Sequence, residues 1–209
     1  MGRARLAARR RLGWAVMEFQ EVVRRRRMVR TFTGEPVSQE SLDRILGNAV
    51  RGPSAGFSQG QSFLVLTDPG DREKFWAIAG AAIAESAQTA PLVIVPMSCK
   101  RVYLERYAQP DKGWTDKDEA RWPVPFWHID TGMAGLLILQ TAVDEGLGAV
   151  YFGIVPEAVA PFRAAFGVPD DQEPIGAIAI GHDDEPEKRD LRSRRRNLAD
   201  VMHYGRWDG

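Results

Sequence analysis

Cysteine and histidine are scarce in this chain of 209 residues. Cys99 is the only cysteine, which excludes an intrachain disulfide and a cysteine-rich zinc site and fits a reducing compartment. The three histidines, His128, His182 and His203, do not pair at ligand spacing with one another or with Cys99. We therefore expect no metal site, and we interpret Cys99 as a buried core residue.

The chain also lacks net charge and long apolar runs. It has 28 basic and 28 acidic side chains, so no overall field draws it to nucleic acid or to an anionic membrane. No apolar run approaches the ~20 residues that span a bilayer. The arginines near the N-terminus are not followed by the apolar segment of a signal peptide. We expect a cytoplasmic protein without a nucleic-acid or membrane partner.

No linker divides the sequence, so one domain is expected over residues 17–209. Residues 1–16 form a basic arm that does not fit the pattern beginning at Met17. Either this arm lies on the surface, poorly ordered, or translation starts at Met17. The sequence leaves both alternatives open.

Apolar patterns predict strands that are separated by helices, with too few residues for regular crossovers, which indicates an α+β fold. The predicted strands cover residues 62–67, 91–96, 149–153 and 174–181. The predicted helices cover residues 18–27, 38–49, 70–87, 130–145 and 157–166. Between them, residues 100–127 read as a long loop with at most one short helix, because they contain several prolines.

The segment 130–145 is the most apolar helix of the chain and has almost no polar face. We therefore expect protein to cover it on nearly all sides, with half of that cover coming from a second subunit. Gly146 followed by Leu147 predicts that the helix ends in a Schellman motif.

Two stretches predict a binding site for an anion. Arg26, Arg27 and Arg30 concentrate fixed positive charge where a helix ends, and the guanidinium group grips phosphate bidentately. Residues 52–59 form a loop of small residues that leads into a strand, and such a loop lets backbone amides approach a ligand.

The order of these motifs resembles the FMN-dependent nitroreductase family. The chain has R-R-x-V-R-x-F at Arg26–Phe32, then P-S-A-G-x-x-Q at Pro53–Gln59, then Gly146-Leu147-Gly148 and a basic tail. The resemblance runs from about Glu18 to the C-terminus. It implies a mixed, mainly antiparallel central sheet flanked by helices, in an intertwined homodimer that binds FMN.

The resemblance also implies the residues that contact FMN. The phosphate would lie on the arginine cluster and on a basic pair in the tail, and the flavin would meet a loop of the neighbouring subunit and the backbone after a strand. These residues are Arg26, Arg27, Met28, Arg30, Pro53, Ser54, Ala55, Gly56, Phe152, Gly153, Ile154, Arg194 and Arg195. Two positions depart from the family pattern: Met28 replaces a small hydroxyl residue, and Phe57 replaces an asparagine.

By the same resemblance, Phe57 and the aromatic residues of segment 100–127 would form the wall of the acceptor site. The aromatic positions are Tyr103, Tyr107, Trp114 and Trp122, and the alternative for them is a hydrophobic patch buried in the dimer. The implied activity is hydride transfer from NAD(P)H through FMN to a nitroaromatic, a quinone or another small planar acceptor. No catalytic residue of the chain is needed, because the flavin carries the chemistry. The alternatives are a nucleic-acid-binding module, a flavin-binding protein without turnover, and a specialised member with one dedicated substrate.

Overall fold

The computed structural model describes residues 17–187 and 191–207. The predicted arm 1–16 lies outside the described residues. The α-helices are α2 Phe19–Arg25, α3 Gln39–Ala49, α4 Pro69–Ala79, α5 Lys100–Tyr107, α6 Phe126–Asp144 and α7 Pro156–Phe166. The strands are β1 Gln61–Leu66, β2 Leu92–Ser98, β3 Gly148–Phe152, β4 Glu173–Pro174 and β5 Ala177–Gly181.

The strands form one sheet in the order β1-β2-β5-β3, with the short β4 also paired to β2. Every pair of strands is antiparallel, and Met28 adds a parallel bridge to Ala149 on β3. Every residue of β2 is buried, as its continuous apolar run predicts for a strand covered on both faces. The predicted α+β fold with a mainly antiparallel sheet is confirmed.

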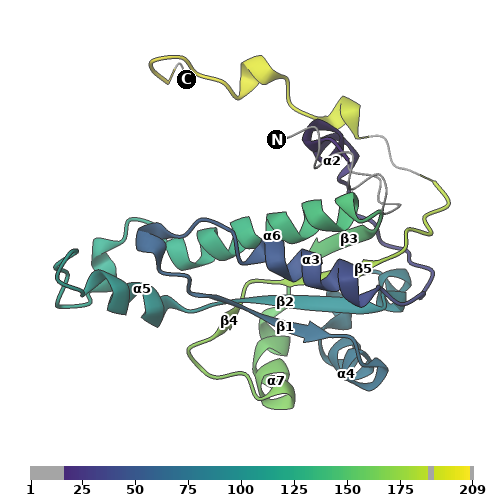
Figure 1. Ribbon diagram of the computed structural model, residues 1–209, viewed down its shortest axis with the longest axis horizontal. Helices are drawn as coiled ribbons and strands as arrows, with labels where there is room; N and C mark the ends of the chain where they lie inside the picture. The colour runs from purple at the N-terminus through teal and green to yellow at the C-terminus, as the bar shows by residue number, and fades with distance from the viewer. Residues whose placement is uncertain (1–16, 188–190, 208–209) are drawn as a thin grey trace, which may run out of the picture.

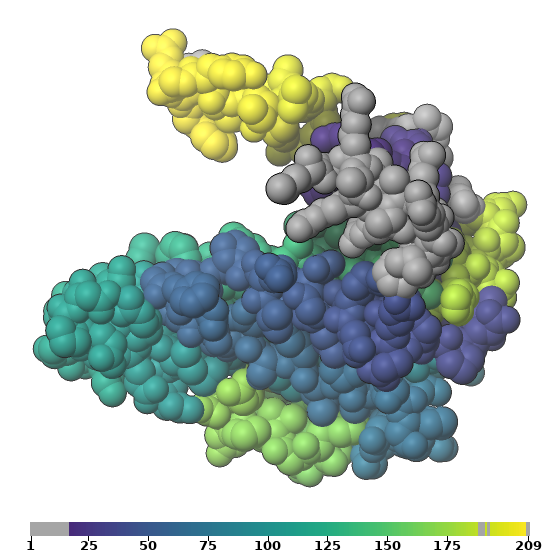
Figure 2. All heavy atoms as spheres, in the orientation of Figure 1, coloured from purple at the N-terminus to yellow at the C-terminus, as the bar shows by residue number. Residues whose placement is uncertain are grey.

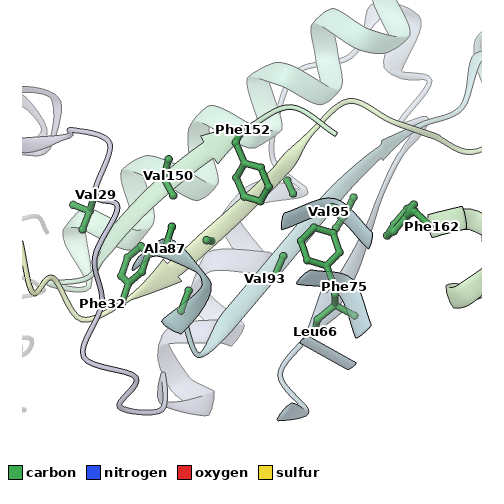
Figure 3. Close-up of a cluster of buried hydrophobic side chains, with 14 of the residues drawn as sticks. Val29, Phe32, Leu66, Phe75, Ala87, Val93, Val95, Val150, Phe152 and Phe162 are labelled. Carbon is green, nitrogen blue, oxygen red and sulfur yellow. The ribbon is translucent and has the colours of Figure 1, made fainter. Parts of the chain in front are cut away.

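Helices cover both faces of the sheet, with α3 and α6 on one face and α4 and α7 on the other (Figure 1). The α4/α7 face carries an aromatic core in which Phe75 lies 6.4 Å from Phe152 and 6.1 Å from Phe162, measured between ring centroids (Figure 3). On the α3/α6 face, Ile45 and Ile138 pack with Ile178 of β5. The two cores fix the sheet between the helix layers.

Two predicted elements are interrupted. The helix predicted over 70–87 ends at Ala79 and gives way to the 3₁₀ turns Gly80–Ala82 and Glu85–Thr89, where the Gln88 side chain donates to the Gly80 carbonyl. The strand predicted over 174–181 divides into β4 and β5 because Gly176 has a φ of 146°. A Cβ at Gly176 would lie 2.6 Å from the Tyr151 hydroxyl oxygen, so the chain bends away from the ladder there.

The segment 100–127 contains the α-helix α5, the 3₁₀ turn Glu119–Arg121 and the first two residues of α6, where at most one short helix was predicted. Helix α6 starts four residues before its predicted start, at Phe126 rather than Asp130. Its predicted Schellman end is confirmed, because the Leu147 amide donates to the Ala142 carbonyl at 2.8 Å and Gly146 has a φ of 76°.

After β5 the chain leaves the body and forms the 3₁₀ turns Arg192–Arg194 and Leu198–Asp200. Figures 1 and 2 show this tail standing off the α6 side of the body. Its apolar side chains remain uncovered, with Leu198 70% and Trp207 79% exposed. Within residues 17–187 and 191–207, no helix is both long and apolar enough to cross a membrane.

Candidate functional site

The arginine stretch runs alongside strand β3. Helix α2 ends where the Arg26 amide donates to the Val22 carbonyl, and the chain then becomes extended. The Val29 amide donates to the Ala149 carbonyl at 2.9 Å, and the Val29 side chain is buried. A Cβ at Gly148 would lie 2.8 Å from the Val29 side chain, so the glycine allows this close approach. The register therefore fixes Arg26 and Arg30 at the edge of the sheet.

Most arginines of this stretch are neutralised by carboxylates of the same protomer. Arg24 and Arg25 pair with Glu21 on α2, and Arg27 pairs with Asp183 and Glu185 beyond β5. Burial alone would lower the pKa of Arg27, but hydrogen bonds with Glu185 and Asp183 outweigh it and leave that pKa raised. Arg27 thus ties two distant segments together, which departs from its predicted role on a phosphate.

Arg26 and Arg30 differ in this respect from Arg24, Arg25 and Arg27. Both side chains are half-buried, and in the described part of the chain neither guanidinium group pairs with a carboxylate. Arg30 Nη1 donates to the Met28 carbonyl at 3.2 Å, which orients the guanidinium without neutralising its charge. Glu185 Oε1 accepts from the Arg30 amide at 2.6 Å, but among the described residues neither guanidinium group forms an ion pair, so both can take an external anion.

The backbone at the end of β3 supplies a second group of donors. Phe152 is buried and stacks on Trp76 at 5.8 Å between ring centroids, which holds the strand end in place. Among the described residues, the amides of Gly153 and Ile154 have no backbone carbonyl partner, and a Cβ at Gly153 would meet open space. The Met28 sulfur accepts from the Tyr151 amide at 3.4 Å and so connects the arginine stretch to this strand end. Predicted site residues from the arginine stretch and from residues 152–154 are thus brought together.

The loop at residues 53–59 has a constrained shape. Gly56, Phe57 and Gln59 have φ values of 60°, 56° and 55°. The Ala55 amide donates to Asp130 Oδ2 at 2.8 Å, and Arg106 Nε donates to the Gly56 carbonyl at 2.9 Å. The Phe57 ring is 77% exposed. Left-handed backbone at non-glycine residues stores strain that is found mostly at functional sites.

This loop lies far from Arg26 and Arg30 within one protomer. The loop contacts Asp130 near the start of α6. Met17, which lies just before α2, donates its amide to Asp144 at the end of α6. Fourteen helical residues separate the two contacts, which amounts to about 21 Å at 1.5 Å per residue. Figure 1 shows α2 over the end of α6 that leads to β3, and α5 beside the other end of α6. The predicted parts of the site are therefore not brought together in a single protomer.

The aromatic residues of segment 100–127 pack mainly on one another. Tyr107 lies 4.9 Å from Trp114 and 4.5 Å from Trp122, and Trp122 lies 5.8 Å from Phe126, all between ring centroids. Tyr103 has no exposed surface and donates its hydroxyl to Asp130 at 2.8 Å. Tyr103 is thus a core residue of the protomer, contrary to its predicted place in the wall of an acceptor site.

Arg194 and Arg195 of the tail are exposed, and across the described residues no hydrogen bond or ion pair joins them to Arg26 or Arg30. Sequence reasoning also missed Asp130, although an acidic residue inside the most apolar helix was a signal that could have found it.

Over the same described ranges, no group of three or more His, Cys, Asp or Glu residues is arranged to hold a metal ion.

In the described part of the chain the fold is α+β, with Arg26 and Arg30 on a stretch bridged to the edge strand β3 and with free backbone amides after the end of that strand. The sequence matches the model of the Nitroreductase family over residues 23–182, so the chain belongs to this family. A Methanothermobacter thermautotrophicus protein, provisionally described as an NADH dehydrogenase/NAD(P)H nitroreductase, is 29% identical over 91% of this chain and 88% of its own length.

Two further relatives agree with this assignment. The NADPH-flavin oxidoreductase of Vibrio harveyi is 25% identical over 79% of this chain and 65% of its own length. A crystal structure of a provisionally assigned nitroreductase from Exiguobacterium sibiricum, in complex with FMN, superposes with a TM-score of 0.72 at 20% identity, covering 91% of this chain and 98% of the other. At that identity the likeness shows the fold alone.

Proposed function

We propose that this protein is an FMN-dependent oxidoreductase that takes a hydride from NAD(P)H and passes it to a small planar acceptor, such as a nitroaromatic or a quinone, in a ping-pong cycle. The observation that carries the proposal is twofold: within the described residues, Arg26 and Arg30 lack a carboxylate partner on the stretch that Met28 bridges to β3, and the amides of Gly153 and Ile154 after the end of β3 lack a backbone partner. A flavin mononucleotide has one phosphate and one hydrogen-bonding ring, which match these two groups of donors. The names of the Methanothermobacter and Vibrio relatives support the choice of donor and cofactor.

In this proposal, Arg26 and Arg30 hold the phosphate, and the amides after β3 contact the ring edge. When bound, FMN supplies the hydride chemistry, so the chain needs to provide neither a nucleophile nor a metal. The chain's own contribution is to orient the ring, to exclude water and to supply a stacking surface for donor and acceptor in turn.

A homodimer completes the proposed site. On α6, Ile129, Met133 and Leu136 are 38%, 42% and 47% exposed and share one helical face, which is an apolar surface suited to a second copy. A two-fold axis across this face would set the two α6 helices antiparallel. The loop 53–59 of one copy would then lie near Arg26 and Arg30 of the other, and the uncovered tail could wrap the partner and bring Arg194 and Arg195 to the same phosphate.

The spectrum of the purified protein tests the proposal. We expect yellow protein with non-covalent flavin absorbance, or colourless protein that gains flavin bands when FMN is added. Anaerobic NADH or NADPH should then bleach these bands, and a quinone should restore them. Protein that binds FMN without bleaching would be a flavin-storing protein, and protein that does not bind FMN would contradict the proposal as a whole.

We further propose that Phe57, with Tyr107, Trp114 and Trp122, makes the acceptor site apolar. Phe57 has a left-handed backbone that asparagine adopts more readily, and the residue is 77% exposed in its own protomer. Phe57→Asn should therefore raise the free energy of unfolding by about 1 kcal/mol. It should keep FMN bound and lower kcat/KM for a hydrophobic quinone about tenfold more than for a small polar nitro compound.

Gln59→Asn is the matched control, because Gln59 has nearly the same φ and is also exposed. It should raise stability to a similar extent, measured by urea unfolding, and leave the ratio of the two kcat/KM values unchanged. If Phe57→Asn lowers both kcat/KM values equally, or lowers neither, Phe57 lies outside the acceptor site.

A further inference from the structure

Asp130 is a buried carboxylate near the start of the apolar helix α6. Its side chain is 5% exposed, and its Oδ2 accepts from the Ala55 amide and from the Tyr103 hydroxyl, both at 2.8 Å. In residues 17–187 and 191–207 it has no cationic partner. Burying a carboxylate is costly unless hydrogen bonds compensate it, so these two donors are what make its position tenable.

Tyr103 connects the two ends of the strained loop. Its hydroxyl reaches Ala55 through Asp130, and its ring lies against Gly60, where a Cβ would come within 2.6 Å of Cε2. Gly60 also accepts at its carbonyl from the Cys99 amide at 2.9 Å. Residues 55 and 60 are therefore held on one buried support, and between them the left-handed Phe57 and Gln59 are exposed, whereas the left-handed Gly56 is half-buried.

The loop that Asp130 and Tyr103 hold leaves several of its residues in solvent. Phe57 and Gln59 are exposed, and Pro53 is exposed as well. A hydrogen-bonded buried carboxylate that fixes a strained and outward-facing loop is typical of a site that must be held in one geometry for a ligand.

We infer that Asp130 and Tyr103 are positioning residues for the cofactor site of the other copy in the dimer. They hold loop 53–60 in the shape in which Pro53–Gly56 meets FMN bound at the partner's arginines. The inference rests on the proposed function and extends it to two residues that touch neither flavin nor substrate. It also explains why Tyr103 is buried rather than part of the wall of the acceptor site.

Tyr103→Phe removes the hydroxyl and keeps the ring against Gly60. We expect FMN to bind about tenfold more weakly to this variant, with the visible circular dichroism of the bound flavin altered and the dimer intact by light scattering. Asp130→Asn, which keeps an acceptor oxygen, should have a smaller effect than Asp130→Ala. Thr131→Val is the control, because Thr131 is fully buried on the same helix and donates its hydroxyl to the Trp127 carbonyl instead of the loop.

A mixed dimer tests whether the effect crosses the interface. Copies carrying Arg26→Ala and copies carrying Tyr103→Phe are co-expressed with different tags, and the heterodimer is isolated. If Tyr103 acts on the partner's site, one site of the pair combines an intact arginine with an intact loop, so FMN titration should show one site of wild-type affinity per dimer. If Tyr103 acts on its own copy, both sites are damaged and the titration shows none.

Failure of the proposed function and failure of the positioning role give different results. Wild-type protein that does not bind FMN would overturn the proposed function. Wild-type protein that binds FMN, together with a Tyr103→Phe variant of equal affinity or a heterodimer without a wild-type site, would overturn the positioning role alone. If Thr131→Val weakens FMN binding as much as Tyr103→Phe does, the loss reflects general destabilisation, which would also contradict the inference.

Discussion

Leu136→Glu is expected to convert the protein into a monomer that no longer retains FMN. Leu136 lies on the exposed apolar face of α6 with Ile129 and Met133. A two-fold interface across this face would bury the Leu136 side chains of both copies. Burying an unpaired carboxylate at an interface costs about 2 to 5 kcal/mol, which weakens the dimer by about 30- to 4,000-fold. Because the proposed site takes its arginines from one copy and its loop from the other, flavin affinity should fall together with assembly.

Light scattering at micromolar concentration and FMN titration measure the two consequences on one sample. Ala164→Glu is the control, since Ala164 is exposed on α7, on the opposite face of the sheet (Figure 1). It adds the same charge to an exposed helical position and should leave both assembly and binding unchanged. A Leu136→Glu protein that remains dimeric and yellow would place the interface elsewhere, and a flavin-loaded wild-type monomer would refute the dimer itself.

Arg26→Ala is expected to weaken FMN binding by about 1 to 3 kcal/mol, which is about 5- to 150-fold in Kd. The physical reason is that the guanidinium of Arg26 has no carboxylate partner in the described part of the protomer, so its charge is available to the phosphate. Arg30→Ala should have an effect of the same size. Titration of the apoprotein with FMN, followed by flavin fluorescence, measures both.

Arg24→Ala is the matched control, because Arg24 pairs with Glu21 and its side chain is 73% exposed. Removing it should leave Kd within experimental error of the wild-type value. Equal losses in Arg24→Ala and Arg26→Ala would mean that the cluster acts through its overall charge. Unchanged FMN affinity in both the Arg26 and the Arg30 variants would mean that the phosphate does not bind at this sheet edge.

Local sequence patterns predicted much of the fold, because short-range physics determines them. The continuous apolar run of β2 requires burial on both faces, Gly146 followed by Leu147 fixes the end of α6, and the motif order indicated the family. The position of the arginine stretch at the end of α2 was also predictable, since the helix pattern stops there.

Only the tertiary structure decided which arginines are free. Arg27 is neutralised by Asp183 and Glu185, which are more than 150 residues away along the chain, so no local pattern could reveal the pairing. The same holds for Asp130, whose two donors come from a loop and a helix remote in sequence. A sequence determines which groups can bind an anion, whereas long-range packing decides which of them are already satisfied, because pairing depends on distances in space.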